Sequence, residues 1–252
     1  MSAGFLEIRN LGMSFHGAEG TLEVLRDISF DLGSEEFLCV LGPSGSGKST
    51  LLRLIAGLLE PVSGSIHFSG GEGSPRVGLV FQHANLMPWR TVRQNIALPL
   101  ELREVAPDEV SRRVAEMMRL VGLEEFSSSW PSELSGGMAQ RVAIARAYIQ
   151  EPDLLLLDEP FGALDALTRE RMGSELLRIW QGQRTPVILV THSITEALLL
   201  SDRVLQFSPR PGQVVEDIPV TFARPRTEEL RYTAEFQRFE RRLRGSLQQN
   251  VS

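Results

Sequence analysis

The stretch Gly42-Pro43-Ser44-Gly45-Ser46-Gly47-Lys48-Ser49-Thr50 decides the fold of this chain of 252 residues. It fits the pattern G-x-x-x-x-G-K-[ST] of a phosphate-binding loop, in which backbone amides and one lysine surround the phosphates of a nucleotide. Lys48 is the only lysine in the sequence, and the other 25 of its 26 basic residues are arginines. A compact ammonium group on a flexible stem reaches between two phosphates in a tight loop, where the broad guanidinium group of arginine does not fit. We therefore predict that the loop binds a nucleoside triphosphate, with Lys48 at its β- and γ-phosphates.

The segments on either side of the loop are those that a phosphate-binding loop requires. The apolar run Phe37–Leu41 predicts a buried strand that ends in the loop, and leucines at helical spacing predict a helix over residues 49–59. Similar apolar runs predict buried strands at residues 77–81, 154–157, 187–191 and 204–207. Helical segments between such strands predict an α/β fold with a mainly parallel sheet.

Residues 87–152 are typical of a helical insertion in this core. Pro107, Asp108 and Glu109 predict the start of one helix and Gly122 its end, and residues 138–149 predict a second helix. We predict one large domain over residues 1–225, with its core at 1–86 and 153–225, and a helical tail over 226–252. The arginines of the tail, whose helix is expected at 227–247, are interpreted as a solvated face.

Composition limits the classes of function. A net charge of −6 argues against broad nucleic-acid binding, and the apolar runs are far shorter than the ~20 residues of a membrane span. The N-terminus lacks the basic and apolar regions of a secretion signal. The single cysteine, Cys39, excludes intrachain disulfides and a cysteine metal cluster. These features are typical of a cytosolic protein.

A pair of carboxylates follows the leucine run at residues 154–157. Asp158 and Glu159 come directly after this predicted strand, where a hydrolytic group would meet the phosphates. We expect Asp158 and the Ser49 hydroxyl to hold Mg²⁺, and Glu159 to polarise the attacking water. Thr50 is expected to add a supporting phosphate contact. In isolation, two acidic residues could simply cap a strand.

The run Leu134-Ser135-Gly136-Gly137-Met138-Ala139-Gln140-Arg141 is a second candidate anion site, because serine and paired glycines precede a predicted helix. Alone it could be a flexible turn with Ser135 as a helix cap. Together with the preceding motifs it resembles the signature sequence of ATP-binding cassette (ABC) ATPases. The resemblance implies that Ser135, Gly136 and Gly137 meet the γ-phosphate bound on another subunit, so that a head-to-tail homodimer sandwiches two nucleotides. Met138 stands where that family usually has glutamine.

Further motifs of the same family occur in order along the chain. Gln82 resembles the Q-loop glutamine, which contacts magnesium and the attacking water. Asp165 resembles the D-loop aspartate, His192 the switch histidine that bonds the γ-phosphate, and Phe15 the aromatic residue that stacks on adenine. The resemblance implies a P-loop NTPase core of the RecA-like type with an antiparallel β subdomain and a helical insertion. Without the other motifs, His192 and Phe15 could equally be structural.

Two stretches resemble importer ATPases of the nitrate, sulfonate, taurine and bicarbonate group: residues 86–95, and the paired turns Pro209-Arg210-Pro211-Gly212 and Arg224-Pro225-Arg226. The resemblance implies an ATP- and Mg²⁺-dependent subunit at the cytoplasmic face of the inner membrane. It would act with a separate transmembrane permease and, indirectly, a periplasmic solute-binding protein, and the segment from Gln82 to Asn95 is the expected permease contact. The alternatives are a soluble ABC ATPase acting on ribosomes or DNA, and a small P-loop kinase. The solute is not specified by this sequence.

Overall fold

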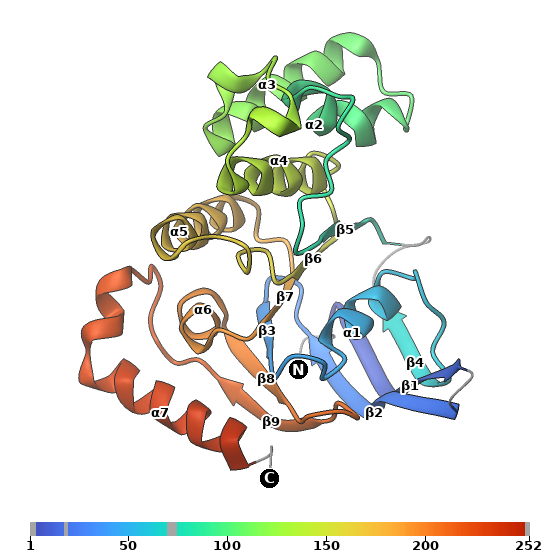
Figure 1. The fold of residues 1–252 in the computed structure, drawn as a ribbon, viewed down its shortest axis with the longest axis vertical. Coiled ribbons are helices and arrows are strands. Elements are labelled where there is room, and N and C mark those ends of the chain that lie inside the picture. The colour runs from blue at the N-terminus through green and yellow to red at the C-terminus, as the bar shows by residue number, and fades with distance from the viewer. Residues whose placement is uncertain (1–3, 18–19, 70–74, 250–252) are drawn as a thin grey trace. The chain divides into compact units, whose positions relative to one another are not determined.

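The computed structural model describes residues 4–17, 20–69 and 75–249 (Figure 1). The outer ends of the predicted domains, residues 1 and 252, lie outside the described residues. The chain divides into two compact units, of which the first comprises residues 1–74 and 184–252 and the second residues 75–183. The predicted insertion, residues 87–152, falls within the second unit, and its bounds as a subdomain stay a prediction.

The first unit contains a mainly parallel sheet. Strand β3 (Phe37–Leu41) pairs in parallel with β7 (Val187–Thr191) on one side and β8 (Arg203–Phe207) on the other. Strand β9 (Val214–Pro219) adds an antiparallel edge next to β8. Every residue of β3 and β7 is buried, as expected for strands covered on both faces. The predicted parallel core is therefore confirmed.

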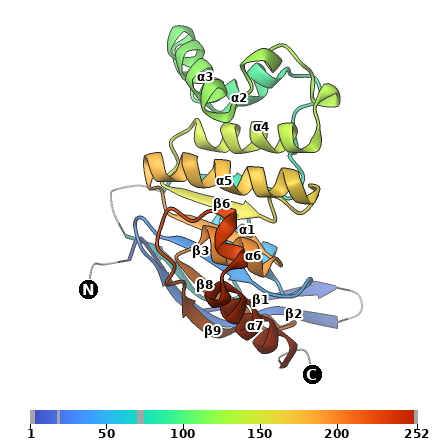
Figure 2. The ribbon, with the colours of Figure 1, turned by 90° about the vertical axis from the view of Figure 1, so that its left-hand side faces the viewer.

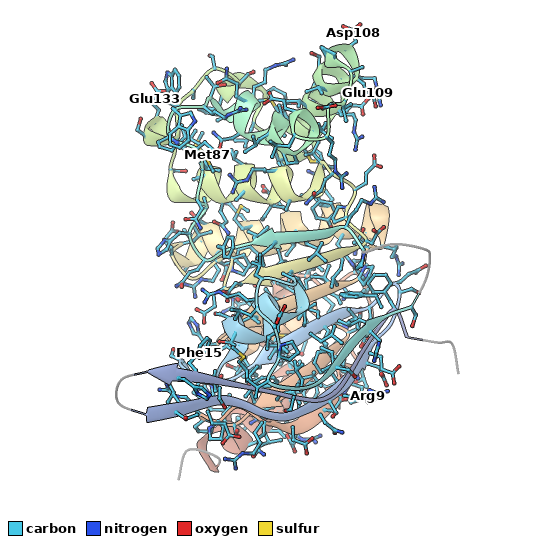
Figure 3. The ribbon with its side chains drawn as sticks, turned by 90° about the vertical axis from the view of Figure 1, so that its right-hand side faces the viewer. Arg9, Phe15, Met87, Asp108, Glu109 and Glu133 are labelled. Atoms are coloured by element: carbon cyan, nitrogen blue, oxygen red, sulfur yellow. The ribbon has the colours of Figure 1, made fainter. Side chains whose placement is uncertain are left out.

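The same unit holds a second, antiparallel sheet, as the family resemblance implied. Strand β1 (Leu6–Gly17) lies between β2 (Gly20–Leu32) and β4 (Ser63–Phe68). Leu6 and Ile8 are fully buried, and the residues between and after them are more exposed, the alternation of a sheet with one covered face. Figure 3 places Phe15 toward the hairpin end of β1 and Arg9 toward the other end.

Helices of the first unit differ from the predictions at their ends. Helix α1 (Lys48–Ile55) is shorter than the predicted 49–59, because Gly57 adopts a left-handed conformation with φ 69° just beyond it. Helix α7 (Ala234–Gln249) begins later than the predicted residue 227. The residues before it form a 3₁₀ helix, η3 (Glu228–Tyr232), and Thr233 is extended, so the tail helix cannot be continuous. Helix α7 packs against α6 (Ile194–Leu200) (Figure 1).

Arg226 holds the start of the tail to the core. Its guanidinium group is buried and donates to backbone carbonyls of four residues, namely Leu198, Ser201, Val220 and Phe222. Burial lowers the pKa of Arg226 to about 10. Arg224 donates to Asp202 (2.8 Å), whose other carboxylate oxygen accepts from the backbone amide of Phe37 at the start of β3 (3.0 Å). The Arg224-Pro225-Arg226 turn therefore has a structural role in this chain.

The second unit combines a parallel strand pair with a stack of helices. Strands β5 (Val77–Val80) and β6 (Leu154–Asp158) pair in parallel, and β5 is one residue shorter than predicted. Figure 2 shows α2 and α3 above α4, with α5 below it. The helical elements are α2 (Val92–Glu101), α3 (Pro107–Val121), α4 (Gly136–Tyr148), α5 (Ala166–Gln183) and the short 3₁₀ helices η1 (Glu124–Phe126) and η2 (Pro131–Glu133).

Local signals explain where two of these helices begin and end. Helix α3 starts at Pro107 with Asp108 and Glu109 in its first turn, and Gly122 ends it with φ 65°, as predicted. Helix α4 starts two residues before the predicted Met138, because the hydroxyl of Ser135 accepts a hydrogen bond from the backbone amide of Met138 (3.3 Å) and caps the helix. Over the described ranges, every helix is too short or too polar to cross a membrane.

Candidate active site

The phosphate-binding loop of the first unit connects β3 to α1. Gly45 and Gly47 have φ values of 79° and 91°, in the left-handed region that other residues avoid. A Cβ atom on Gly47 would lie 2.7 Å from Leu25 Cδ2 and 2.9 Å from the carbonyl oxygen of Val24. The loop can therefore pass this close to β2 only because residue 47 is glycine.

Lys48 is buried at the first position of α1, with 4% of its surface exposed. Its ammonium group donates to the carbonyl oxygens of Gly42 (3.0 Å) and Pro43 (2.9 Å). These bonds hold the positive charge within the loop, in front of a helix N-terminus whose free amides also favour anions. The arrangement fits a phosphate group.

The serine hydroxyls of the loop fit the same ligand. Ser46 Oγ is buried, and no protein atom in the described part of the chain hydrogen-bonds to it. A buried hydroxyl without a partner costs stability unless a ligand or water supplies one. Ser49 and Thr50 lie half-buried in the first turn of α1.

His192 lies at the same edge of the parallel sheet as the loop. In the register of β3 and β7, Leu41 pairs with Thr191, so Gly42 and His192 both come one residue after the pair. His192 is exposed, whereas Thr191 is buried and donates from Oγ1 to the Glu196 carboxylate (2.6 Å). The residue before His192 is thus fixed in place.

Phe15 lies in the antiparallel sheet, opposite Leu22 of β2. Phe15 is 40% exposed and Leu22 is 48% exposed, so the pair presents an apolar surface next to the hairpin. An exposed aromatic ring of this kind can stack on a base. Phe15, residues 42–50 and His192 all belong to the first unit.

The second unit brings the predicted carboxylates to the end of β6. Asp158 is its last residue and is 8% exposed. Glu159 follows with φ 44°, a left-handed conformation that costs a non-glycine residue about 1–3 kcal/mol. Strained backbone conformations of this kind gather at functional sites, where they aim a side chain.

Gln82 lies beside Glu159 in this unit. The register of β5 and β6 pairs Val80 with Leu157, so Gln82 and Glu159 both come two residues after the pair. A Cβ atom on Gly162 would lie 3.3 Å from Gln82 Nε2 and 3.5 Å from Glu159 Oε2. The amide and the carboxylate therefore approach the same small residue from two strands.

The Ser135-Gly136-Gly137 turn opens α4. Because Ser135 Oγ accepts from the amide of Met138, its own hydrogen stays able to donate to an incoming anion. Ser135 and Gly136 are exposed and Gly137 is buried. A Cβ atom on Gly137 would lie 2.6 Å from Thr168 Cγ2, so glycine lets the turn pack against α5.

Asp165 caps α5, and the residue before it, Leu164, lies near the Ser135-Gly136-Gly137 turn. Its Oδ1 accepts from the backbone amide of Thr168 (3.0 Å), and the bonds from Thr168 lower the pKa of Asp165. Leu164 Cδ2 would lie 3.5 Å from a Cβ atom on Gly136. The predicted signature and D-loop residues are thus neighbours within the second unit.

The candidate oxygen donors within each unit fit Mg²⁺ only together with phosphates. In the described ranges, no three His, Cys, Asp or Glu side chains gather into a cation site. Magnesium is ordinarily bound by one or two carboxylates, waters and the phosphate oxygens of the nucleotide. In the second unit, Asp158 offers one carboxylate and Gln82 one amide oxygen, and in the first unit Ser49 offers one hydroxyl. Each is an oxygen donor of the kind that magnesium accepts.

Two residues of α4 that the sequence analysis did not single out also touch this region. Gln140 and Arg146 donate to backbone carbonyls of the segment around Gln82. The available signal was one glutamine and two arginines within a mainly apolar helix, which does not reveal their partners.

The fold and these motifs define a P-loop nucleotide-binding protein with a cassette signature. A family model described as ABC transporter matches residues 25–162. The chain belongs to this family, and it is an ABC-type ATPase, as the sequence predicted.

Relatives and solved structures agree with this assignment. The taurine import ATP-binding protein of Pelagibacter ubique is 46% identical over 219 residues, which are 85% of this chain and 83% of that protein. The nitrate import ATP-binding protein of Synechocystis sp. is 46% identical over 85% of this chain and 82% of its own length. A solved dimer of an ATP-binding cassette, in a post-hydrolysis state with ADP and Pi bound, has a TM-score of 0.76 and 29% identity, covering 86% of this chain and 100% of its own. These relatives do not support the alternative of an ABC ATPase acting on nucleic acid or ribosomes.

Proposed function

We propose that this chain is the ATP-hydrolysing subunit of an ABC importer for a small solute such as taurine, nitrate or an alkanesulfonate. The observation that carries ATP binding is the position of Lys48, whose buried ammonium group is held inside the loop by two carbonyl oxygens. The importer assignment is supported by the relatives, which include taurine, nitrate and aliphatic sulfonate import ATP-binding proteins.

We assign the first unit to nucleotide binding. Lys48 and backbone N–H groups of the phosphate-binding loop neutralise the phosphates, and Phe15 stacks on the adenine. The hydroxyl of Ser49, with the Asp158 carboxylate and Gln82 of the second unit, would hold Mg²⁺. When bound, the metal ion neutralises the charge that develops on the phosphate oxygens. His192 donates a hydrogen bond to the terminal phosphate.

Glu159 is the proposed general base. Its carboxylate accepts the proton of the attacking water, and Gln82 orients that water from the neighbouring strand. The approach of both side chains to Gly162 supports this pairing. The strained backbone at Glu159 supports it further, because strain of this kind is concentrated at functional sites.

Turnover requires two copies of the chain. Ser135, Gly136 and Gly137 of one copy cap the terminal phosphate bound by the other, in a head-to-tail homodimer. ATP binding then closes the dimer, hydrolysis opens it, and the difference in binding free energy drives a separate permease between two states. Two nucleotides are sandwiched in this arrangement.

The permease contact is proposed around residues 82–95, next to the helical insertion predicted at residues 87–152. Asn95 is fully buried and fixes the loop before α2: its Oδ1 accepts from the Met87 amide (2.8 Å), and its Nδ2 donates to the carbonyl oxygens of Arg90 (2.9 Å) and Thr91 (3.0 Å). This rigid loop presents Trp89 with 70% of its surface exposed. Figure 3 shows Met87 and Glu133 on one side of these helices, with Asp108 and Glu109 on the other. A large exposed aromatic residue on a fixed loop suits a protein contact.

The location follows from the partner. A subunit that docks on a permease is peripheral, at the cytoplasmic face of the inner membrane, and a periplasmic binding protein would deliver the solute.

Purification of the tagged chain from mild detergent tests the proposal, with a hydrophobic membrane protein expected in the complex. If the chain purifies alone and still hydrolyses ATP, it remains an ABC ATPase, and the proposed importer role is contradicted. Growth of a deletion strain on taurine, nitrate or alkanesulfonates as sole nitrogen or sulfur source would then identify the solute.

A further inference from the structure

Helix α4 holds the backbone around Gln82 by three side-chain hydrogen bonds. Gln140 Nε2 donates to the carbonyl oxygen of Phe81 (3.2 Å), directly before Gln82. Arg146 donates through Nη2 to the carbonyl oxygen of Ala84 (2.9 Å) and through Nη1 to that of Asn85 (2.9 Å). The accepting carbonyls come directly before Gln82 in sequence and directly after His83, so the backbone is held on both sides of these two residues.

Of the two donors, Gln140 is buried and Arg146 is half-buried. Gln140 is 3% exposed, and burial lowers the pKa of Arg146. Within the described residues, the Arg146 guanidinium group has no carboxylate partner, so its hydrogen bonds are all to backbone carbonyls. A planar guanidinium group can reach two neighbouring carbonyls at once, which a lysine ammonium group does with poorer geometry.

The N-terminal half of α4, which includes Gln140, is also tied to the next helix. The Arg141 guanidinium group forms an ion pair with the Glu175 carboxylate of α5 (2.9 Å), and Gly137 packs against Thr168 of α5. Helix α4 is continuous from Gly136 to Tyr148, so one helix carries these contacts as well as Gln140 and Arg146. A helix is rigid over this length, so its two ends move together.

We infer that Gln140 and Arg146 are positioning residues that tie the segment at residues 81–85 to the Ser135–Gly137 turn through α4. A displacement of that segment then shifts the turn that caps the terminal phosphate on the other copy. The inference rests on the proposed function, in which the segment after Gln82 adjoins the permease contact. It adds the side chains through which the two motifs move as one body.

Hydrogen exchange of the full chain tests the link. In the Glu159→Gln background, we expect ATP and Mg²⁺ to slow amide exchange both at residues 135–137 and at residues 84–90. Arg146→Met should keep the ATP-dependent protection at 135–137 and lose it at 84–90. Without nucleotide, the same variant should speed exchange at 84–90 by about tenfold or more, the equilibrium change expected for losing a charge-assisted hydrogen bond. Arg146→Lys should give an intermediate result.

Arg113→Met is the matched control. Arg113 also donates to a backbone carbonyl of this unit, that of Ile149 (2.6 Å), but its partner lies beyond the C-terminal end of α4. It should leave exchange at residues 84–90 unchanged. Gln140→Leu provides a second test of the link should Arg146→Met fail to fold.

The possible outcomes distinguish failure of the proposed nucleotide sandwich from failure of the inferred link through α4. Absence of ATP-dependent protection at residues 135–137 in the parent chain would contradict the proposed sandwich. Protection at 135–137 together with an unchanged ATP response at 84–90 in both Arg146→Met and Gln140→Leu would overturn the inference. A purely structural role would lower the melting temperature and speed exchange across the whole unit, and this result would also count against the link.

Discussion

The side-chain amide of Gln82 and the carboxylate of Glu159 both lie against Gly162, at 3.3 Å and 3.5 Å from the position that a Cβ atom would take there. The two residues are 77 positions apart in sequence and come from the ends of neighbouring parallel strands. Their approach brings a hydrogen-bond donor and a potential base to one point, which is what a hydrolytic water requires. Residue 162 must stay small for this pairing to persist.

Replacement of Glu159 by glutamine should stop hydrolysis while leaving ATP binding intact. The amide keeps the size of the side chain and removes the base, so the rate should fall by about 10²–10⁴-fold. Phosphate release measures the rate, and a fluorescent ATP analogue measures the affinity. Hydrolysis at the parent rate would remove Glu159 from its assigned role.

Replacement of Gly47 by alanine should destabilise the chain more than replacement of Gly45. Both glycines have positive φ, which costs alanine about 1–2 kcal/mol. A Cβ atom at Gly45 meets no atom within 4 Å, whereas at Gly47 it would lie 2.7 Å from Leu25 and 2.9 Å from Val24, adding about 1–3 kcal/mol. Urea unfolding without nucleotide measures the difference, and equal losses for the two variants would contradict the crowding at Gly47.

Replacement of Ser135 by arginine should abolish turnover and spare nucleotide binding to each monomer. The large cation fills the turn that is proposed to cap the phosphate of the other copy. Isothermal titration of the variant with ATP, beside its phosphate release, measures the two properties. Turnover at more than a few per cent of the parent rate would argue against the cap.

Asp153 should make stability depend on pH in the acid range. Hydrogen bonds from the Arg76 side chain and amide lower the pKa of Asp153 below 3.8, so its contribution is present above that pH and is lost as the pH falls further. Both side chains are about 40% exposed, so Asp153→Asn should cost only about 0.5–1 kcal/mol at pH 7. Chemical unfolding at pH 7 and pH 2.5 checks this, and a cost that persists at pH 2.5 would contradict it.

Local signals in the sequence were sufficient for part of the fold. Strand β3 is wholly apolar, and β7 is apolar up to its last residue, Thr191. Short apolar runs of this kind between turn residues predict buried strands. Helix α3 carries its own start and stop signals at Pro107 and Gly122. The phosphate-binding loop likewise depends on neighbouring residues alone.

The rest depends on contacts that a linear pattern does not contain. Helix α2 was not predicted, because Pro99 within it removes a backbone donor and suggests a break, although a capping box at Thr91 and Gln94 starts the helix firmly. Arg146 and Arg226 donate several of their hydrogen bonds to backbone carbonyls that are more than 20 residues away in sequence. An arginine in a sequence suggests a charged surface, so its backbone partners become visible only in the folded chain.

Mixing two inactive variants tests the head-to-tail sandwich most directly. Lys48→Ala lacks a working phosphate loop and Ser135→Arg lacks a working cap, so each homodimer is inactive. A mixed dimer pairs the intact loop of the second variant with the intact cap of the first and contains one complete site. The account predicts that an equal mixture regains ATP hydrolysis, up to about a quarter of the parent rate, since half of the dimers are mixed and each has one of two sites. A mixture that forms mixed dimers and stays inactive would contradict it.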